Sequence, residues 1–307
     1  MKRALIFALL SGASFFAQDG VRPIWPERPL PCVSERVAVL EDTRLKECSG
    51  LCCSLRTSEI FWTLNDSGGE PCVYAVDRAG KTRAKVRLPE AVNFDWEDIA
   101  SGRDENGEAQ LFIGDIGDNF RLRPTIQVYQ ITEPAVAAVG DTPDERLSSV
   151  PKVWRASYPD GKHNAESLLV HPLTRRIYIL TKSEDGRSAL YVFPEKLRED
   201  QVMILEEVAA LNFPTLIRVG KRPRDNSMAT SACFSPDGTR MVAATYSSLY
   251  EWGLPSGMPL GQALKQAPSR LEPPLLRQLE SVCYDSDSLT LWLTSEHLPT
   301  PLLRVKR

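Results

Sequence analysis

Acidic and amide side chains recur at close spacing in three segments of the chain. Asp95 and Glu97 are separated by one residue, Asp66 opens an Asp-Ser-Gly-Gly turn, and Gly114–Asn119 reads Gly-Asp-Ile-Gly-Asp-Asn. Carboxylate and carboxamide oxygens are hard ligands, which suit calcium better than zinc. Gly114–Asn119 is not an EF-hand loop, because the long ligand ladder and its terminal glutamate are absent. The pattern therefore favours a calcium site assembled from several parts of the chain.

Three sets of candidate residues follow from these segments and from others of the same kind. The candidate metal ligands are Asp66, Glu97, Asp115, Asp118, Glu166 and Glu280. The candidates for proton transfer in a hydrolytic reaction are Asp115, Glu166 and His163. The candidates for binding a ligand are Asn65, Asp95, Trp96, Asn119, Arg121, Asn164, Lys182, Glu296 and His297. Ca²⁺ is the cofactor that these oxygen donors predict.

Each kind of candidate also has an ordinary structural role as an alternative. Trp96 could floor a sugar or ring pocket, or it could pack in the core. Arg121 could hold a phosphate or carboxylate, or it could pair with a neighbouring acid. His163 could act as a base near Glu166, or it could stay exposed in a loop. The carboxylates could accept hydrogen bonds from backbone N–H groups at strand starts instead of holding a metal, or they could line a binding pocket without a metal.

Composition excludes several classes of protein. The 307 residues include 37 Lys and Arg against 40 Asp and Glu, so the net charge of −3 provides no basic surface for nucleic acid. The 23 prolines and 18 glycines interrupt the chain every few residues, which excludes coiled coils, helical solenoids and polytopic membrane proteins. A turn-rich, mostly β protein remains.

A repeat in the sequence predicts how the candidate residues are positioned. Five segments begin with a polar residue, here called the opener, and continue as a short apolar strand: Ser49–Cys53, Glu97–Ser101, Glu166–Val170, Thr230–Phe234 and Glu280–Tyr284. A second strand carries a large apolar residue 12 to 15 positions after each opener: Trp62, Phe112, Tyr178, Val242 and Trp292. Third strands follow at Val73–Ala75, Val128–Gln130, Leu190–Val192, Leu249–Glu251 and Leu302–Arg304.

Repeated units of four short strands describe the blades of a β-propeller. Fourth strands are expected at Thr82–Leu88, Lys152–Tyr158 and Val202–Leu211. The unit that begins at Glu280 has room for only three strands, and Val37–Leu40 can supply the fourth and close the ring. We expect an all-β propeller of five blades. The long spacings over 97–166 and 166–230 leave room for a sixth, and a β-sandwich is the alternative fold.

Antiparallel strand order places the openers at the same face of the disc as the loops between second and third strands. Because the opener begins the innermost strand, Glu97, Glu166 and Glu280 are expected to converge on the central channel. Carboxylates at close range raise one another's pKa unless a cation or an arginine neutralises them. Ser49 and Thr230 occupy the other opener positions, so a ring of five acids is not expected.

The N-terminus has the pattern of an export signal. Met1–Arg3 is positively charged, Ala4–Leu10 is apolar, and small residues follow up to Ala17. We therefore expect a secreted or periplasmic protein after cleavage, with cleavage after Ala13 and a buried N-terminal strand as alternatives. The expected organisation is a signal peptide over 1–17, an N-terminal segment with the ring-closing strand over 18–47, and the propeller over 48–307.

Seven cysteines suit an oxidising compartment. Cys52, Cys233 and Cys283 fall at one position of the repeat, where they are expected to be core residues. The other four cluster near the N-terminus, and one or two disulfides of open connectivity are expected among them: Cys32, Cys48, Cys53 and Cys72. No Cys/His spacing indicates a zinc site.

Six motifs carry a family resemblance. They are Trp62–Gly68, Asn93–Ala100, Gly114–Asn119, Asn164–Leu169, Ser235–Gly238 and Leu291–Glu296. The chain resembles, from about residue 45 to its C-terminus, a family of secreted and largely uncharacterised bacterial β-propeller proteins. That resemblance implies a propeller fold and export, and it implies no activity. The architecture is more loosely similar to calcium-dependent gluconolactonase- and regucalcin-type propellers and to phytase-like propellers, in which strand glutamates face a mouth that can hold metal.

Two classes of function are consistent with these features. In the first, the propeller is a scaffold whose acidic face binds a cation and a small-molecule ligand, a glycan or an envelope protein. In the second, a metal polarises an ester, lactone or phosphoester and activates water. No nucleophile motif stands out, which favours the scaffold. We expect a monomer with no nucleic-acid partner and no membrane span.

Overall fold

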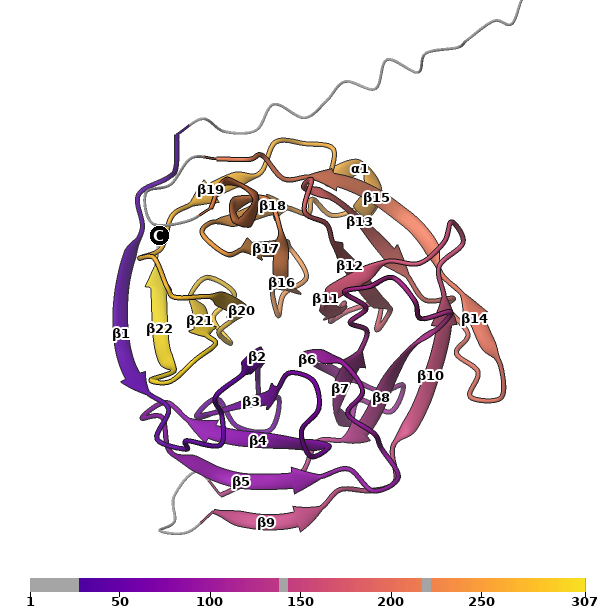
Figure 1. The fold of residues 1–307 in the computed structure, drawn as a ribbon, viewed down its shortest axis with the longest axis vertical. Helices are drawn as coiled ribbons and strands as arrows, with labels where there is room; N and C mark the ends of the chain where they lie inside the picture. Colours follow the sequence, from indigo (N-terminus) through magenta and orange to yellow (C-terminus); the bar gives the residue numbers. More distant parts are fainter. Residues whose placement is uncertain (1–27, 138–142, 217–221, 307) are drawn as a thin grey trace, which may run out of the picture.

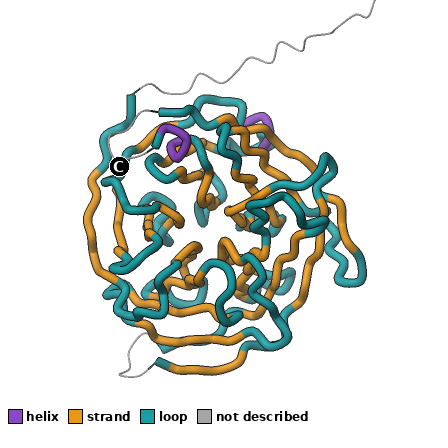
Figure 2. Tube along the Cα trace, in the orientation of Figure 1, coloured by secondary structure: helices purple, strands orange, loops and turns teal. Residues whose placement is uncertain are grey.

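The computed structural model describes residues 28–137, 143–216 and 222–306. The expected signal peptide over 1–17 lies outside this part of the chain. Within it, 22 strands form five sheets around one central axis, so the fold is the expected five-bladed β-propeller (Figure 1). Figure 2 shows strands and loops almost throughout, with helix confined to two short turns, η1 (Pro223–Asn226) and α1 (Leu260–Ala263).

Each blade contains an antiparallel sheet of four strands, named here from the axis outward. The first blade contains β2 (Cys48–Cys53), β3 (Ile60–Asn65), β4 (Cys72–Asp77) and β5 (Thr82–Arg87). The second contains β6 (Trp96–Arg103), β7 (Ala109–Asp115), β8 (Ile126–Thr132) and β10 (Lys152–Ser157). The third contains β11 (Asn164–Val170), β12 (Ile177–Lys182), β13 (Arg187–Val192) and β15 (Glu206–Asn212). The fourth contains β16 (Ala229–Phe234), β17 (Arg240–Thr245), β18 (Leu249–Gly253) and β19 (Ser269–Leu271). The fifth contains β20 (Leu279–Tyr284), β21 (Leu291–Ser295), β22 (Pro301–Lys306) and β1 (Val33–Val39).

The repeat position read from the sequence is the same register position in every blade. The third residue after each opener lies directly opposite the large apolar residue of the second strand. The pairs are Cys52 with Trp62, Ala100 with Phe112, Leu169 with Tyr178, Cys233 with Val242, and Cys283 with Trp292. Cross-strand pairs of this kind stabilise a sheet and fix its register.

The hydrophobic core is divided among the interfaces between blades. Five clusters of buried side chains are present, and each draws residues from two neighbouring blades. Phe61 in the first blade, for example, packs on Trp292 in the fifth, with ring centroids 5.0 Å apart. A single blade therefore has no core of its own, and the blades stabilise one another around the ring.

The ring is closed by the N-terminal strand, as predicted. β1 pairs antiparallel with β22, from Val33 opposite Lys306 to Val39 opposite Pro301. The first and last strands of the described chain thus belong to one sheet, and they lie side by side in Figure 1. This pairing covers the edge that β22 would otherwise expose.

Three local features differ from the expectations. The single strand expected over Val202–Leu211 is split, because β14 (Val202–Ile204) pairs in parallel with β10 of the second blade while β15 stays in the third. A further strand, β9 (Asp144–Leu147), pairs in parallel with β5 and was not expected. All seven thiols are free, so the structure contains none of the disulfides expected near the N-terminus.

Candidate metal centre

A β-bulge lies at the opener in every innermost strand. The register shifts between the residues on either side of Glu97, Glu166, Thr230 and Glu280, and across Ser49 and Gly50 in β2. A bulge leaves its residue outside the ladder and re-aims that side chain. The same β-bulge thus removes the opener from the strand pairing in all five blades. We call the end of the channel where these strands begin the acidic mouth.

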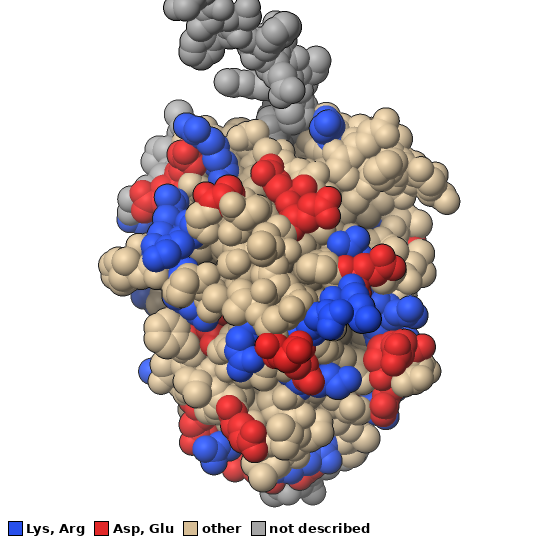
Figure 3. Space-filling view, turned by 90° about the vertical axis from the view of Figure 1, so that its right-hand side faces the viewer, with Lys and Arg blue, Asp and Glu red and all other residues tan. Residues whose placement is uncertain are grey.

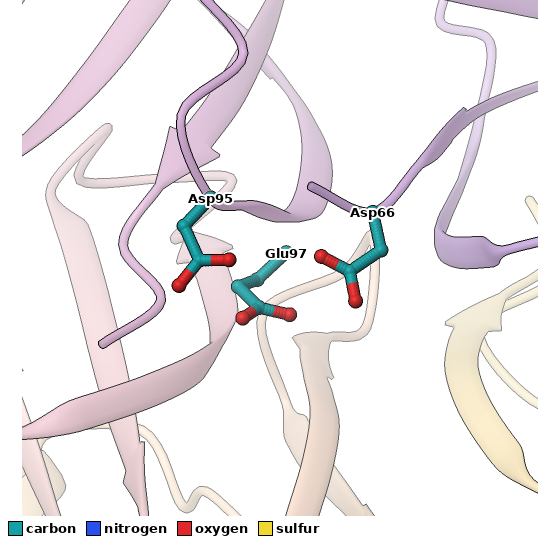
Figure 4. Close-up of side chains that lie close together, drawn as sticks. All are labelled: Asp66, Asp95 and Glu97. Atoms are coloured by element: carbon teal, nitrogen blue, oxygen red, sulfur yellow. The ribbon is translucent and has the colours of Figure 1, made fainter. Parts of the chain in front are cut away.

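Three carboxylates from two blades meet at the acidic mouth. Asp66 directly follows β3, Asp95 directly precedes β6, and Glu97 is the bulged residue of β6. One oxygen from each of the three lies within 4.8 Å of the others, and Figure 4 shows the three carboxylates turned toward one another. We call Asp66, Asp95 and Glu97 the carboxylate triad.

Glu97 is the most buried member of the carboxylate triad. The residue is 2% exposed, and its carboxylate accepts no hydrogen bond from any residue that the structure describes. A buried carboxylate normally needs hydrogen bonds or a partner of opposite charge to offset its lost hydration. Asp66 and Asp95 are partly exposed, so the triad is open to solvent on one side.

Gly117 covers the carboxylate triad with bare backbone. Its N–H donates to the carbonyl of Asp95 at 3.1 Å, which holds the loop after β7 against the start of β6. A Cβ at Gly117 would overlap Glu97 Oε1 and would lie 2.6 Å from Asp95 Cγ. Any larger residue at this position would therefore require the carboxylates of Glu97 and Asp95 to move.

Burial and mutual repulsion perturb all three acids. Burial is the largest cause that raises the pKa of Glu97 well above its usual range, followed by the charges of Glu166, Asp66 and Asp95. Burial and then the charge of Asp66 raise the pKa of Asp95 to about 6. Burial likewise raises the pKa of Asp66. A bound dication would relieve this repulsion, because it favours the ionised form of each acid.

A buried ion pair lies beside the carboxylate triad. Lys182 at the end of β12 donates to Glu166 Oε1 at 2.6 Å and to the Tyr246 hydroxyl at 2.7 Å. Burial lowers the pKa of Lys182, but the charges of Glu166 and Glu280 outweigh it, so the pKa is raised well above its usual value. Glu166 is thus neutralised by a lysine, whereas no cation of the described chain pairs with Glu97.

A second group of acids completes the acidic mouth. The Gln278 amide donates to Glu280 Oε1 at 2.7 Å and to Glu296 Oε2 at 2.6 Å. Glu280 Oε2 is buried without a hydrogen-bond partner in the described chain. Burial and the charge of Glu166 raise the pKa of Glu280 well above its usual value. Burial and the charge of Asp66 raise the pKa of Glu296 to about 7.

Two of the candidate metal ligands hold the loop after β7 instead of facing the carboxylate triad. Asp115 is fully buried, pairs with Arg123 at 2.8 Å and accepts from Gln127 at 3.0 Å. Asp118 accepts the backbone N–H groups of Leu122 and Arg123 at 2.8 and 2.7 Å. Their oxygens are used in fixing the turn that places Gly117.

The amide candidates also bind neighbouring loops. Asn65 accepts from the Glu47 N–H at 3.2 Å and donates to the Arg44 carbonyl at 2.7 Å. Asn164 accepts from the Asp118 N–H at 2.7 Å and donates to Asn119 Oδ1 at 3.2 Å. These bonds connect the loops of neighbouring blades around the mouth.

The remaining candidates contribute no ligand atom to the carboxylate triad. Trp96 is completely buried and packs on Tyr129, with ring centroids 5.8 Å apart. His163 pairs with Asp160 at 3.0 Å, and its ring packs edge-to-face against Tyr158, with ring centroids 4.9 Å apart. Two more lie in loops with positive φ: Arg121 (54°) and His297 (67°).

The backbone ties expected of the openers are made by the residue after the opener. Asp98 accepts from the Leu168 N–H of the next blade at 3.0 Å, and Ser231 accepts from the Val282 N–H of its next blade at 3.2 Å. Asp98 lies in the Asn93–Ala100 motif, but its role depends on a bulge that sequence spacing does not reveal. Gly117, Tyr246 and Gln278 were missed for the same reason, since only the folded ring brings them to the mouth.

The opposite mouth is different in character. A cavity of about 420 Å³ lies where the innermost strands end, and its lining is mainly apolar, with Leu51, Ile99 and the thiol-bearing Cys53 among the residues.

The side of the molecule shown in Figure 3 carries acidic and basic side chains interspersed with uncharged surface. No helix in the described residues has the length and apolarity needed to cross a membrane.

Comparison with known proteins adds little to this geometry. No known protein family matches the chain, and no curated protein is similar in sequence. Among solved structures, the chain is similar to the β-propeller domain of Cps50 (Swd1) from Myceliophteria thermophila. The identity is 10%, the TM-score is 0.42, and the similarity covers 89% of this chain and 99% of that domain. The strand order of the chain itself establishes the propeller.

Proposed function

We propose that this protein is an exported scaffold that binds Ca²⁺ at the carboxylate triad and binds a ligand or partner through the acidic mouth. One observation carries the proposal. Glu97 is buried, accepts no hydrogen bond in the described chain, and shares a 4.8 Å cluster with two further carboxylates. Export is supported by the N-terminal sequence pattern and by the resemblance to secreted propellers.

The donor set fits a hard dication. Calcium takes six to eight oxygen ligands at about 2.3–2.6 Å, and the three carboxylates offer up to six oxygens. Asp66, Asp95 and Glu97 would hold the ion, and the partly exposed side would leave positions for water or for an oxygen of the ligand. The unpartnered Glu280 Oε2 supplies a second buried acceptor at the same mouth.

A metal-dependent hydrolase that uses the same face is the alternative function. Its expected proton carriers are engaged elsewhere: Asp115 with Arg123, Glu166 with Lys182, and His163 with Asp160. These contacts favour binding over catalysis. Turnover of a lactone or phosphoester that requires both calcium and Glu97 would instead support the hydrolase.

The test is the thermal midpoint of the mature protein in excess calcium and in chelator. Calcium at a hundredfold excess over its Kd would add about 2.7 kcal/mol to the free energy of unfolding. For a chain of this size, that raises the midpoint by about 5 °C. Glu97→Gln should abolish the rise, whereas Glu105→Gln, at an exposed loop carboxylate, should preserve it. An unchanged midpoint in the wild type would refute cation binding.

A further inference from the structure

Four large apolar side chains are exposed on the two loops that frame the carboxylate triad. Val92 and Phe94 precede β6, and they are 61% and 64% exposed. Phe120 and Leu122 follow β7, and they are 84% and 70% exposed. We call these four residues the apolar rim. Clustered exposed apolar side chains on a folded protein mark a binding surface more often than isolated ones do.

The two loops that carry the apolar rim are held against each other beside the carboxylate triad. Phe94 is the residue before Asp95, and the loop that carries Phe120 also contains Gly117, whose N–H donates to the Asp95 carbonyl. The Arg123 guanidinium lies over the Phe94 ring at 4.9 Å and also pairs with Asp115. The two loops thus hold each other: one carries Asp95 of the triad, and the other reaches it through the hydrogen bond of Gly117.

Positive charge accompanies the apolar rim. Arg121 is exposed between Phe120 and Leu122 and has a positive φ of 54°. Lys162 donates to the Leu122 carbonyl at 2.9 Å, which places an ammonium group beside the same loop. A ligand at this place would therefore meet a dication, basic side chains and an apolar surface together. An anion with an apolar tail is complementary to all three.

We propose that the ligand bound through the cation is a small organic anion with an alkyl or aryl tail. Its anionic oxygens would fill the open positions of the metal and contact Arg121, and its tail would lie on Phe94, Phe120 and Leu122. This inference rests on the proposed function, because it requires the cation. It goes beyond the proposed function because it names the chemical class of the ligand and the surface that selects this ligand.

The experiment is calorimetric titration of the full chain with calcium and then with butanoate, hexanoate and octanoate. In calcium, affinity should rise about fourfold for each methylene that is buried. In chelator, none of the three should bind. The double variant Phe120→Ser/Leu122→Ser should reduce the rise to less than twofold per methylene and leave calcium affinity unchanged. The matched control is Leu173→Ser, because Leu173 is 67% exposed and lines the cavity at the opposite mouth.

The outcomes separate this inference from the proposed function. Calcium binding without any dependence on chain length overturns the inference and leaves the cation site intact. Absence of calcium binding overturns both. A dependence on chain length that survives in the rim variant, or that is lost in Leu173→Ser, places the tail elsewhere and overturns the inference. Binding to anionic lipid vesicles alone, or dimerisation that the rim variant abolishes, would assign the rim to a membrane or to a second copy and would also overturn it.

Discussion

Gly117 and Glu97 are packed so closely that a methyl group on the glycine would overlap the carboxylate oxygen. The loop after β7 therefore limits the space above the carboxylate triad by backbone atoms alone. Asp118 and Arg123 hold this loop in place through bonds to its backbone. The space above the three carboxylates is thus set by a turn as well as by the acids.

Substitution Gly117→Ala should disturb the triad without touching an acid. Overpacking of this kind typically costs about 1–3 kcal/mol, so the free energy of unfolding in chelator should fall by that amount. The calcium-dependent rise in thermal midpoint should disappear. Gly253→Ala is the matched control, because a Cβ there would meet no atom within 4 Å. Equal calcium responses in the two variants would show that Gly117 does not shape the site.

Substitution Glu97→Gln should stabilise the protein when no cation is present. The unfolded chain ionises Glu97 at pH 7, whereas burial and neighbouring acids favour the protonated form in the folded state. The amide removes this cost at nearly constant volume, so the free energy of unfolding in chelator should rise by about 1–3 kcal/mol. Urea denaturation measures the change, and Glu105→Gln should stay within about 0.5 kcal/mol of the wild type. A loss of stability on Glu97→Gln would contradict the unpaired state of this acid.

Substitution Lys182→Met should lower the free energy of unfolding. It would leave Glu166 buried without its partner, and breaking a buried ion pair costs about 3–5 kcal/mol. The double variant Lys182→Met/Glu166→Leu should recover most of the loss. Arg187→Met provides the control, because the Arg187–Asp185 pair is exposed and should contribute less than about 1 kcal/mol. Equal losses of stability in Lys182→Met and Arg187→Met would argue against burial as the cause of the loss in Lys182→Met.

Without a cation, stability should fall as the pH rises from about 4 to 7. Burial and the charge of Asp66 raise the pKa of Asp95 to about 6 and that of Glu296 to about 7 in the folded state. The folded state therefore binds more protons than the unfolded state in this interval, and the stability that protonation gives is lost as the pH passes the folded values. Chelator-treated protein should have a lower thermal midpoint at pH 7.5 than at pH 5. Glu296→Gln should make this difference smaller, and an unchanged difference would count against Glu296.

Calcium should have the reverse dependence on pH. The ion binds ionised carboxylates, so its stabilising effect should grow between pH 5 and pH 7.5 as the acids lose their protons. The quantity to compare is the midpoint in calcium minus the midpoint in chelator at each pH. A difference that shrinks with rising pH would be incompatible with binding at carboxylates.

The blade count, the strand order and the ring closure could be predicted because each depends on patterns that recur along the chain. The position of Trp62 relative to Ser49 predicts a cross-strand pair, and the structure contains that register in all five blades. The short outer strands were harder to predict. β9 and β14 each add to the sheet of the preceding blade and not to the sheet that contains the strands on either side of them in sequence. β19 has only three residues.

The mouth of the ring could be predicted only in part. Spacing places Asp66, Asp95 and Glu97 at the correct end of the blades, because that follows from antiparallel order. Spacing alone does not reveal which acids are already neutralised. Asp115 pairs with Arg123, and Glu166 pairs with Lys182. Each basic residue comes close to its acid only in the folded protein.

The closure of the ring by β1 and β22 also determines how the protein would respond to tension. Val33 and Lys306 lie opposite each other, so the start of β1 and the end of β22 lie at the same end of this strand pair. A force that pulls the two ends apart would load the bonds of the ladder one after another rather than all together. The β1–β22 pair would therefore separate at low force. The other four blades would bear the force only after this pair has separated.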